Sequence, residues 1–228
     1  MIVLHHCHGT RSMRVLWLLH ELGVEFSLRV RPFDRTLRDP EYLSINPSGR
    51  VPALEIDGET VWESGAILEI LCERFPERGL GRPPGDIDRP DFLTWLHFAE
   101  TISQSSTALT QQHIVLREDA MRSPTVMRLE AARLGKLFAA IEGRLSTPVE
   151  NRDYLLTSGF SAADIAVGQA VWMARHFAPL DPFPEVARWY REITEREAFR
   201  RSLPPADAEP LYASDFYPAW PDADTVPR

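Results

Sequence analysis

Residues 46–67 constrain the fold more than any other stretch of the chain. They contain two short runs typical of β-strands, 53–56 and 60–62, on either side of the pair Asp57-Gly58. An Asp-Gly pair in this setting predicts a tight β-hairpin, because both turn residues must adopt a positive φ. The sheet that contains this hairpin therefore has at least one antiparallel pair of strands.

A proline precedes the predicted hairpin, and an acid–hydroxyl pair follows it. Pro52 stands at the entrance to the first strand, where its missing N–H costs no ladder bond, and it is a candidate for a cis peptide bond. Glu63 and Ser64 follow the second strand, where an apolar-periodic run predicts a helix over 64–75. A helix N-terminus offers free backbone N–H groups and a positive dipole end, so this region can hold a small zwitterion.

The order of elements predicts an α/β first half and an all-α second half. Residues 1–77 show the order strand, helix, strand, short helix, hairpin and helix, which is the order of a thioredoxin-like domain with four strands and three helices. A stretch rich in proline and glycine follows, and we expect the linker over residues 78–87. Helical periodicity then predicts an all-α domain over 88–203, followed by a tail over 204–228.

Composition excludes several classes of function. The chain has 228 residues and a formal net charge of -8, which argues against non-specific binding of nucleic acid. It has two cysteines without metal-type spacing, so we expect neither a disulfide framework nor a metal site. No signal peptide and no membrane-spanning run is evident, and we therefore expect a cytoplasmic protein without membrane contact.

The pairs Val51-Pro52 and Glu63-Ser64, at this spacing around a hairpin, resemble the glutathione-binding half of the cytosolic glutathione S-transferases. The resemblance implies a thioredoxin-like domain followed by a helical-bundle domain, and glutathione as co-substrate. It also implies that Val51-Pro52 dock the cysteinyl part of glutathione and that Glu63-Ser64 hold its γ-glutamyl group. Arg50, and more weakly Arg38, are candidates for contact with a glutathione carboxylate.

The same resemblance points to a hydroxyl in the first strand-to-helix turn. A cysteine thiol has an ordinary pKa of about 8.5, and the thiolate is the nucleophile, so the protein must stabilise the anion. In the serine-type members, a serine lies four residues before an arginine, and here Thr10 occupies that position before Arg14. Ser12 is the substitute donor, and the alternative for Thr10 is a role restricted to capping the helix.

Cys7 is a rival candidate, because some members of the family use a cysteine for thiol exchange. It lies upstream of the matching position, and we expect an ordinary thiol in a loop or at the end of a strand. The neighbouring histidines His5, His6 and His8 are too close in sequence to form one tetrahedral metal site with it.

The resemblance implies that a small-molecule electrophile binds between the two domains. His8, His113 and Arg117 are candidates for contact with it, as are the aromatic residues of the tail. Family members are often homodimers in which the first bundle helix of the partner lies near glutathione, so Glu100 or Gln104 could act across an interface.

Three functions remain open at this point. The first is a glutathione S-transferase that activates the glutathione thiolate for attack on an electrophile. The second keeps the glutathione site but performs thiol transfer, peroxide reduction, isomerisation or ether cleavage. The third is a non-catalytic relative that acts as a binding module.

Ser161 and Asp164 form an S-x-x-D capping box at the start of a predicted helix. The serine side chain can accept a bond from the first turn, and the aspartate can accept one from the serine N–H. The glutathione S-transferases carry a similar box in the second domain, and we expect a structural role for it here.

Overall fold

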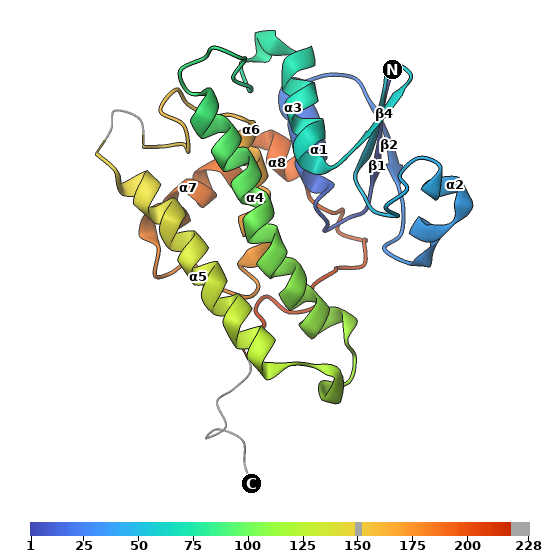
Figure 1. The fold of residues 1–228 in the computed structure, drawn as a ribbon, viewed down its shortest axis with the longest axis vertical. Helices are drawn as coiled ribbons and strands as arrows, with labels where there is room; N and C mark the ends of the chain where they lie inside the picture. Colours follow the sequence, from blue (N-terminus) through green and yellow to red (C-terminus); the bar gives the residue numbers. More distant parts are fainter. Residues whose placement is uncertain (149–151, 220–228) are drawn as a thin grey trace.

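The computed structural model describes residues 1–148 and 152–219. A four-stranded sheet and its three helices form one side of the molecule, and a group of longer helices forms the other (Figure 1). The predicted fold class, a thioredoxin-like half followed by a helical half, is confirmed. The exact domain boundaries and the tail over 204–228 stay predictions, and residues 220–228 lie outside the described part of the chain.

The sheet has the strand order β2-β1-β3-β4. The pair β1–β2 is parallel, as the strand–helix–strand start predicts, whereas β1–β3 and β3–β4 are antiparallel. The elements of this half are β1 (Ile2–His6), α1 (Met13–Leu22), β2 (Ser27–Val30), α2 (Pro40–Leu43), β3 (Ala53–Ile56), β4 (Glu59–Trp62) and α3 (Ser64–Arg74).

The hairpin between β3 and β4 has the expected turn. Asp57 and Gly58 have φ values of 53° and 86°, so both turn residues lie in the left-handed region that the Asp-Gly pair accommodates. The peptide bond between Val51 and Pro52, at the entrance to β3, is cis. Both sequence-based expectations for this stretch are confirmed.

The helical half is built on two long helices that lie side by side, α4 (Arg89–Thr110) and α5 (Pro124–Ser146) (Figure 1). A π-helical turn, Gln111–Val115, extends α4. The helix α6 (Ala162–Ala174) packs against α4. The helix that the sequence predicts over 185–197 is present as α7 (Pro184–Thr194), and a further short helix, α8 (Glu197–Ser202), follows it without having been predicted. Arg196 adopts an extended conformation between them. Within the described ranges, no helix is long and apolar enough to cross a membrane.

The two halves share one continuous apolar core along α1, α6 and α8. Trp17 of α1 is fully buried and packs edge-to-face on Phe199 of α8, with ring centroids 4.8 Å apart. Gly168 lets α6 lie close to Trp17 and to Ile193 of α7, because a Cβ there would lie 2.5 Å from Ile193 and 3.3 Å from the Trp17 ring. The helices that carry the first half's loops are therefore fixed against the bundle.

The capping box at α6 is present. The Ser161 hydroxyl accepts a hydrogen bond from the Ala163 N–H at 3.2 Å, and the Asp164 carboxylate accepts one from the Ser161 N–H at 2.9 Å. The carboxylate also accepts bonds from the Leu155 N–H at 2.9 Å and the Trp189 indole N–H at 3.0 Å. Asp164 therefore joins three segments of the bundle.

Burial dominates the electrostatics of Asp164. It raises the pKa of the fully buried carboxyl to about 6, although its hydrogen bonds to Leu155, Trp189 and Ser161 act in the opposite direction. The carboxylate is thus ionised at neutral pH and accepts all of these bonds.

Replacing Asp164 with alanine should lower the free energy of unfolding by roughly 2–4 kcal/mol, because three buried N–H donors lose their acceptor. Urea unfolding of the wild-type and Asp164→Ala proteins measures this change. The exposed Asp181 offers a matched control, and Asp181→Ala should change stability little. Equal stability of Asp164→Ala and wild type would show that the box has no structural role.

Candidate functional site

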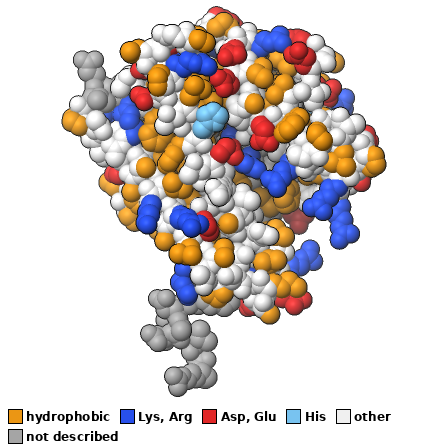
Figure 2. All heavy atoms as spheres, in the orientation of Figure 1, with side chains coloured by type: hydrophobic (Ala, Val, Ile, Leu, Met, Phe, Trp, Pro, Cys, Tyr) orange, Lys and Arg blue, Asp and Glu red, His pale blue; other side chains and the backbone are white. Residues whose placement is uncertain are grey.

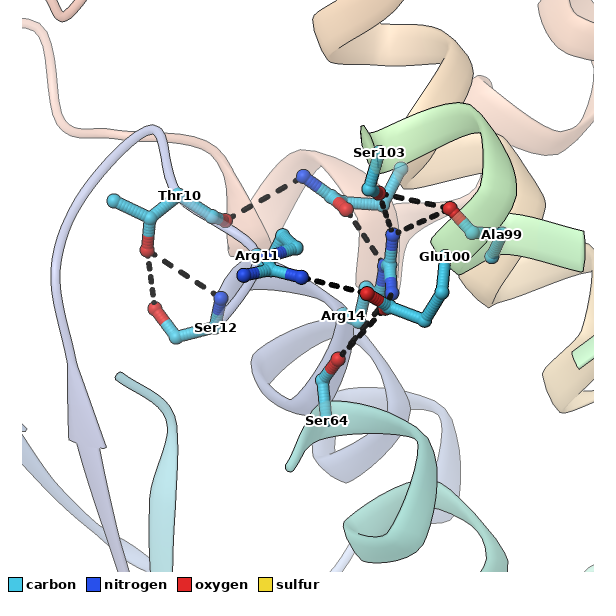
Figure 3. Close-up of polar contacts among 9 residues, drawn as sticks. Thr10, Arg11, Ser12, Arg14, Ser64, Ala99, Glu100 and Ser103 are labelled. Carbon is cyan, nitrogen blue, oxygen red and sulfur yellow. Dashed lines mark hydrogen bonds and ion pairs between the residues drawn. The ribbon is translucent and has the colours of Figure 1, made fainter. Parts of the chain in front are cut away.

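The site is centred on the loop between β1 and α1, which carries Thr10. The Thr10 hydroxyl donates to the Cys7 carbonyl at 2.9 Å, and its Oγ1 lies 2.9 Å from the Ser12 Oγ. The Thr10 carbonyl accepts a hydrogen bond from the Gln169 side chain at 3.4 Å, and the Thr10 hydroxyl faces Ser12 (Figure 3). Both ends of Thr10 are therefore held, by its own loop and by α6.

Thr10 and Ser12 differ in access to the surface. Thr10 is 8% exposed and lines a cavity, whereas Ser12 is fully buried. The Ser12 Oγ accepts from the Cys7 N–H at 3.1 Å and lies 2.8 Å from the His6 Nδ1. The geometry thus favours Thr10 over Ser12 for contact with a bound sulfur, and the choice between them stays a prediction.

Cys7 has the environment of a structural thiol. It is fully buried, and its sulfur donates to the Pro32 carbonyl at 3.6 Å. Burial raises the pKa of the Cys7 thiol to about 12, against a smaller lowering effect of Arg31. At neutral pH the thiol is therefore protonated and a poor nucleophile.

The loop before the cis peptide bond is held by two buried donors. Asn46 and Tyr42 each donate a side-chain hydrogen bond of 2.7 Å to the Arg50 carbonyl. This fixes the backbone at the residue before Val51-Pro52, which is where the family resemblance places the cysteinyl part of glutathione. Val51 lines the same cavity as Thr10, and Pro52 is buried behind it.

Glu63 and Ser64 lie at the N-terminus of α3, as expected. Glu63 is exposed and has a φ of 76°, an unusual conformation for a residue with a side chain. The Ser64 hydroxyl accepts a hydrogen bond from Arg14 at 3.2 Å and lies 3.4 Å from a carboxylate oxygen of Glu100. Ser64 is therefore connected to α1 and to α4 (Figure 3).

A buried guanidinium group is at the centre of this connection. Arg14 of α1 is 1% exposed, and it forms an ion pair with Glu100 of α4. Its remaining donors reach Gln169 of α6 at 2.8 Å, Ser103 at 2.6 Å and the Ala99 carbonyl at 3.3 Å. One side chain thus joins both halves of the molecule.

Glu100 has two arginine partners in its own chain. One carboxylate oxygen is paired with Arg14, and the other accepts from Arg11 at 2.6 Å (Figure 3). Although burial, the largest single influence, acts to raise it, the pKa of Glu100 is lowered by these two arginines. The group is therefore a carboxylate, and it lies beside Ser64.

A cavity of about 710 Å³ opens beside Thr10, between the two halves. It brings together Thr10, Arg38, Arg50, Val51 and Arg117 from the residues singled out in the sequence. The remaining lining is Arg11, Phe33, Asp34, Arg35, Leu37, Gly49, Thr107, Val115, Met173 and Leu211. Figure 2 shows Lys and Arg side chains gathered across the middle of this face, between the helical half and the α2 side of the sheet half.

Several arginines of the cavity are not neutralised. Within residues 1–148 and 152–219, no carboxylate forms a salt bridge with Arg38, Arg50 or Arg117. Their combined charge favours a ligand with more than one anionic group. Glutathione carries two carboxylates, so the electrostatics of the cavity suit it.

Two predicted contacts of the second substrate lie outside this lining. His8 is half-buried next to His6, with 3.3 Å between the ring nitrogens. His113 stacks on Phe177, with ring centroids 5.5 Å apart, and also packs against Tyr217 of the C-terminal segment. Arg117 is the one of the three predicted contacts that lines the cavity, and roles for the other two stay predictions. No group of three or more His, Cys, Asp or Glu side chains in the described ranges could hold a metal ion.

Sequence analysis missed the network around Arg14. It used Arg14 only as a spacing marker, although an arginine among the apolar residues on the buried side of a helix is itself a signal of a buried ion pair. It also missed Gln169, whose amide bonds both Arg14 and the Thr10 carbonyl. No local pattern identifies that residue, because its partners lie more than 150 positions away.

Family models match both halves of the chain. The model of the glutathione S-transferase N-terminal domain matches residues 9–74, and that of the C-terminal domain matches residues 115–197. The chain is 27% identical over 219 residues to glutathione S-transferase 3 of Schizosaccharomyces pombe, with 88% of this chain and 86% of that protein covered. It is 26% identical over 209 residues to the glutathione S-transferase GstB of Escherichia coli, with 85% and 93% covered.

Solved structures agree on the fold. A glutathione S-transferase from Xylella fastidiosa superposes with a TM-score of 0.78 at 21% identity, covering 89% of this chain and 97% of that one. A sphingomonad glutathione S-transferase in complex with glutathione gives a TM-score of 0.74 at 26% identity, covering 88% and 96%.

Both cysteines should resist thiol chemistry in the folded protein, because Cys7 and Cys72 are buried with pKa values raised to about 12. Incubation with oxidised glutathione or a maleimide near neutral pH, followed by mass spectrometry of the intact chain, should show almost no adduct. The denatured chain is the control and should take up two maleimide groups. Rapid modification of folded Cys7 would instead support a cysteine-based exchange mechanism.

Proposed function

Because this chain belongs to the glutathione S-transferase family, we propose that it binds glutathione and activates its thiolate for attack on an electrophilic small molecule. The observation that carries this proposal is the position of Thr10. Its hydroxyl lies in the wall of a cavity that Val51 also lines, next to the N-terminal turn of α1. The cysteinyl sulfur of a glutathione docked on Val51 is thereby directed toward a hydroxyl donor.

The proposed grip on glutathione has three parts. Glu63 and Ser64 hold the γ-glutamyl group at the N-terminus of α3, where the helix dipole favours its carboxylate. The backbone of Val51, beside cis-Pro52, holds the cysteinyl part. Arg50 and Arg38 attract the glycine carboxylate at the cavity wall.

The catalytic contribution is stabilisation of an anion. Each pKa unit by which the glutathione thiol is lowered requires about 1.4 kcal/mol of preference for the thiolate. A hydrogen bond to a charged acceptor contributes roughly 1.5–3 kcal/mol, so a single well-placed Thr10 donor is sufficient for a shift of one to two units. The positive end of α1 acts in the same direction.

The second substrate would lie on the outer part of the cavity. Its apolar side chains, Phe33, Val115, Met173 and Leu211, come from both halves and from the C-terminal segment. Arg117 adds an unpaired positive charge on the helical side. We propose that Arg117 contacts the electrophile and that detoxification of such compounds is the biological role.

The alternative glutathione-dependent chemistries are less well supported. A thiol-transferase of the cysteine type needs a reactive thiol at the site, and the burial of Cys7 argues against one. Peroxide reduction, isomerisation and ether cleavage use the same glutathione grip and remain alternatives. The unneutralised arginines of the cavity argue for ligand binding, as a catalyst or as a binding module.

We also propose that the protein is a cytoplasmic homodimer. Two free, buried cysteines suit a reducing compartment. In a dimer, Gln104 of the partner's α4 could approach glutathione, whereas Glu100 already serves two arginines of its own chain.

Replacing Thr10 with valine, which keeps the shape and removes the hydroxyl, should lower kcat/KM for conjugation roughly 10- to 100-fold, the equivalent of one hydrogen bond to an anion. Glutathione affinity should change little, because the grip lies elsewhere. Thr10→Ser is the matched control and should retain most activity with a model aryl halide. Full turnover by Thr10→Val would remove Thr10 from the mechanism.

The dimer proposal has a direct test in solution. Sedimentation equilibrium or light scattering at micromolar protein should give twice the mass of one chain. A monomeric mass across the concentration range would refute the dimer and any role for Gln104 of a partner.

A further inference from the structure

A row of side chains leads away from Thr10 into the interior of the first half. The Thr10 Oγ1 lies 2.9 Å from the Ser12 Oγ, which lies 2.8 Å from the His6 Nδ1. The His6 Nε2 lies 3.3 Å from the His8 Nδ1. Four side chains thus form a continuous series of hydrogen-bonding distances that ends at the cavity.

Burial isolates the middle of this series from water. Ser12 and His6 are fully buried, Thr10 is 8% exposed, and only His8 has partial access to solvent. Burial is also the main reason that the pKa of His6 is lowered to about 4, with a further lowering by the neighbouring His8. His6 is therefore neutral at neutral pH and carries its single proton on one of two nitrogens.

The position of that proton decides which group donates and which accepts in each hydrogen bond of the series. If Nδ1 carries it, His6 donates to Ser12, and Ser12 is free to donate to Thr10. The Thr10 proton, which is donated to the Cys7 carbonyl at 2.9 Å, can then leave that acceptor and point into the cavity. If Nε2 carries it, Ser12 must donate to His6, and the Thr10 hydroxyl lacks that donor.

We propose that His6 is the Nδ1–H tautomer and that His6 and Ser12 are positioning residues, which turn the Thr10 hydroxyl toward the sulfur of bound glutathione and strengthen its donation. The proposal rests on the proposed function, because it names His6 and Ser12 as the residues that orient Thr10 in that same reaction. His8 completes the series by donating from Nδ1 to the Nε2 of His6.

The physical effect is cooperative polarisation. Each hydroxyl that accepts a hydrogen bond becomes a stronger donor, and the effect is larger in a buried environment of low dielectric constant. No proton crosses the series: every group keeps its own hydrogen, and the thiol proton leaves to solvent. The stronger hydrogen bond from Thr10 lowers the free energy only when Thr10 faces an anion, so it favours the bound thiolate over the thiol.

Few charged groups perturb the series. His8 faces His6, and Asp207 of the C-terminal segment acts on His8. Arg31 and Asp34 act on the neighbouring Cys7, which is itself protonated. The series is therefore neutral at assay pH, and its effect comes from orientation.

The test is the pKa of the glutathione thiol in the binary complex, followed through the ultraviolet absorbance of the thiolate. Ser12→Ala should raise this pKa by about one unit, a tenfold loss of thiolate below the pKa. His6→Leu should act similarly, whereas His6→Asn, which can place an amide N–H near Nδ1, should restore much of the wild-type value. Glutathione affinity should remain within a few-fold of wild type in all three.

A double-mutant cycle separates this effect from general disturbance. In the Thr10→Val background, Ser12→Ala should cause no further rise in the thiol pKa, because the series acts only through Thr10. An additional rise there, or an unchanged pKa in Ser12→Ala alone, would overturn the proposal and leave the function intact. An unchanged pKa in Thr10→Val would contradict the proposed role of Thr10 itself.

A measurement on the unmodified protein covers the case in which Ser12 or His6 variants do not fold. Nitrogen NMR of histidine-labelled protein distinguishes the two neutral tautomers of His6. We expect a protonated Nδ1 near neutral pH, in the presence and absence of glutathione. A protonated Nε2 in the glutathione complex would overturn the proposal.

Discussion

The buried guanidinium group of Arg14 is the interaction on which the site most depends. It donates hydrogen bonds to the side chains of Glu100, Ser64, Ser103 and Gln169 and to a backbone carbonyl. Removal of one partner of a buried ion pair is far more costly than the net contribution of the pair, because a buried charge is left uncompensated. The positions of α3, α4 and α6 relative to α1 are therefore tied to a single side chain. Ser64, which belongs to the proposed grip on glutathione, is held by the same network.

Contacts from three segments of the chain fix the position of Thr10. Gln169 holds its carbonyl, Ser12 contacts its hydroxyl, and the C-terminal segment presses on the preceding residue, where a Cβ added to Gly9 would lie 3.2 Å from Leu211. Gly9 also has a φ of 71°, a conformation that favours glycine. The segment after α8, which lies outside the family resemblance, thus contributes both to the cavity wall and to the shape of the catalytic loop. Its aromatic anchor is Tyr212, which stacks on His176 with ring centroids 4.3 Å apart.

Local sequence patterns were sufficient for the strands and the hairpin, because each depends on neighbours in the chain, whereas the proposed glutathione grip follows from the family resemblance and stays a prediction. Asp57-Gly58 dictates its own turn, and Ser161 and Asp164 form their box within one helical turn. The support of the site could not be predicted in the same way. Arg14 meets Glu100 and Gln169 only after the two halves have packed, and the break at Arg196 between α7 and α8 interrupts a helical pattern without proline or glycine. Whether Thr10 or Ser12 faces the cavity likewise depends on burial, which spacing alone does not specify.

From the sequence alone, threonine in place of serine is a disadvantage at the proposed hydrogen-bond donor to the sulfur. Its methyl group restricts rotation about χ1, and a misdirected hydroxyl could not reach the sulfur. The structure gives a reason why the restriction is useful here. The Oγ1 is already fixed between the Cys7 carbonyl and the Ser12 hydroxyl, so little rotamer entropy remains to be lost when glutathione binds. A serine can make the same two contacts but has more rotamers to lose, whereas the stiffer threonine holds its oxygen in place in advance, and only its proton has to turn toward the thiolate.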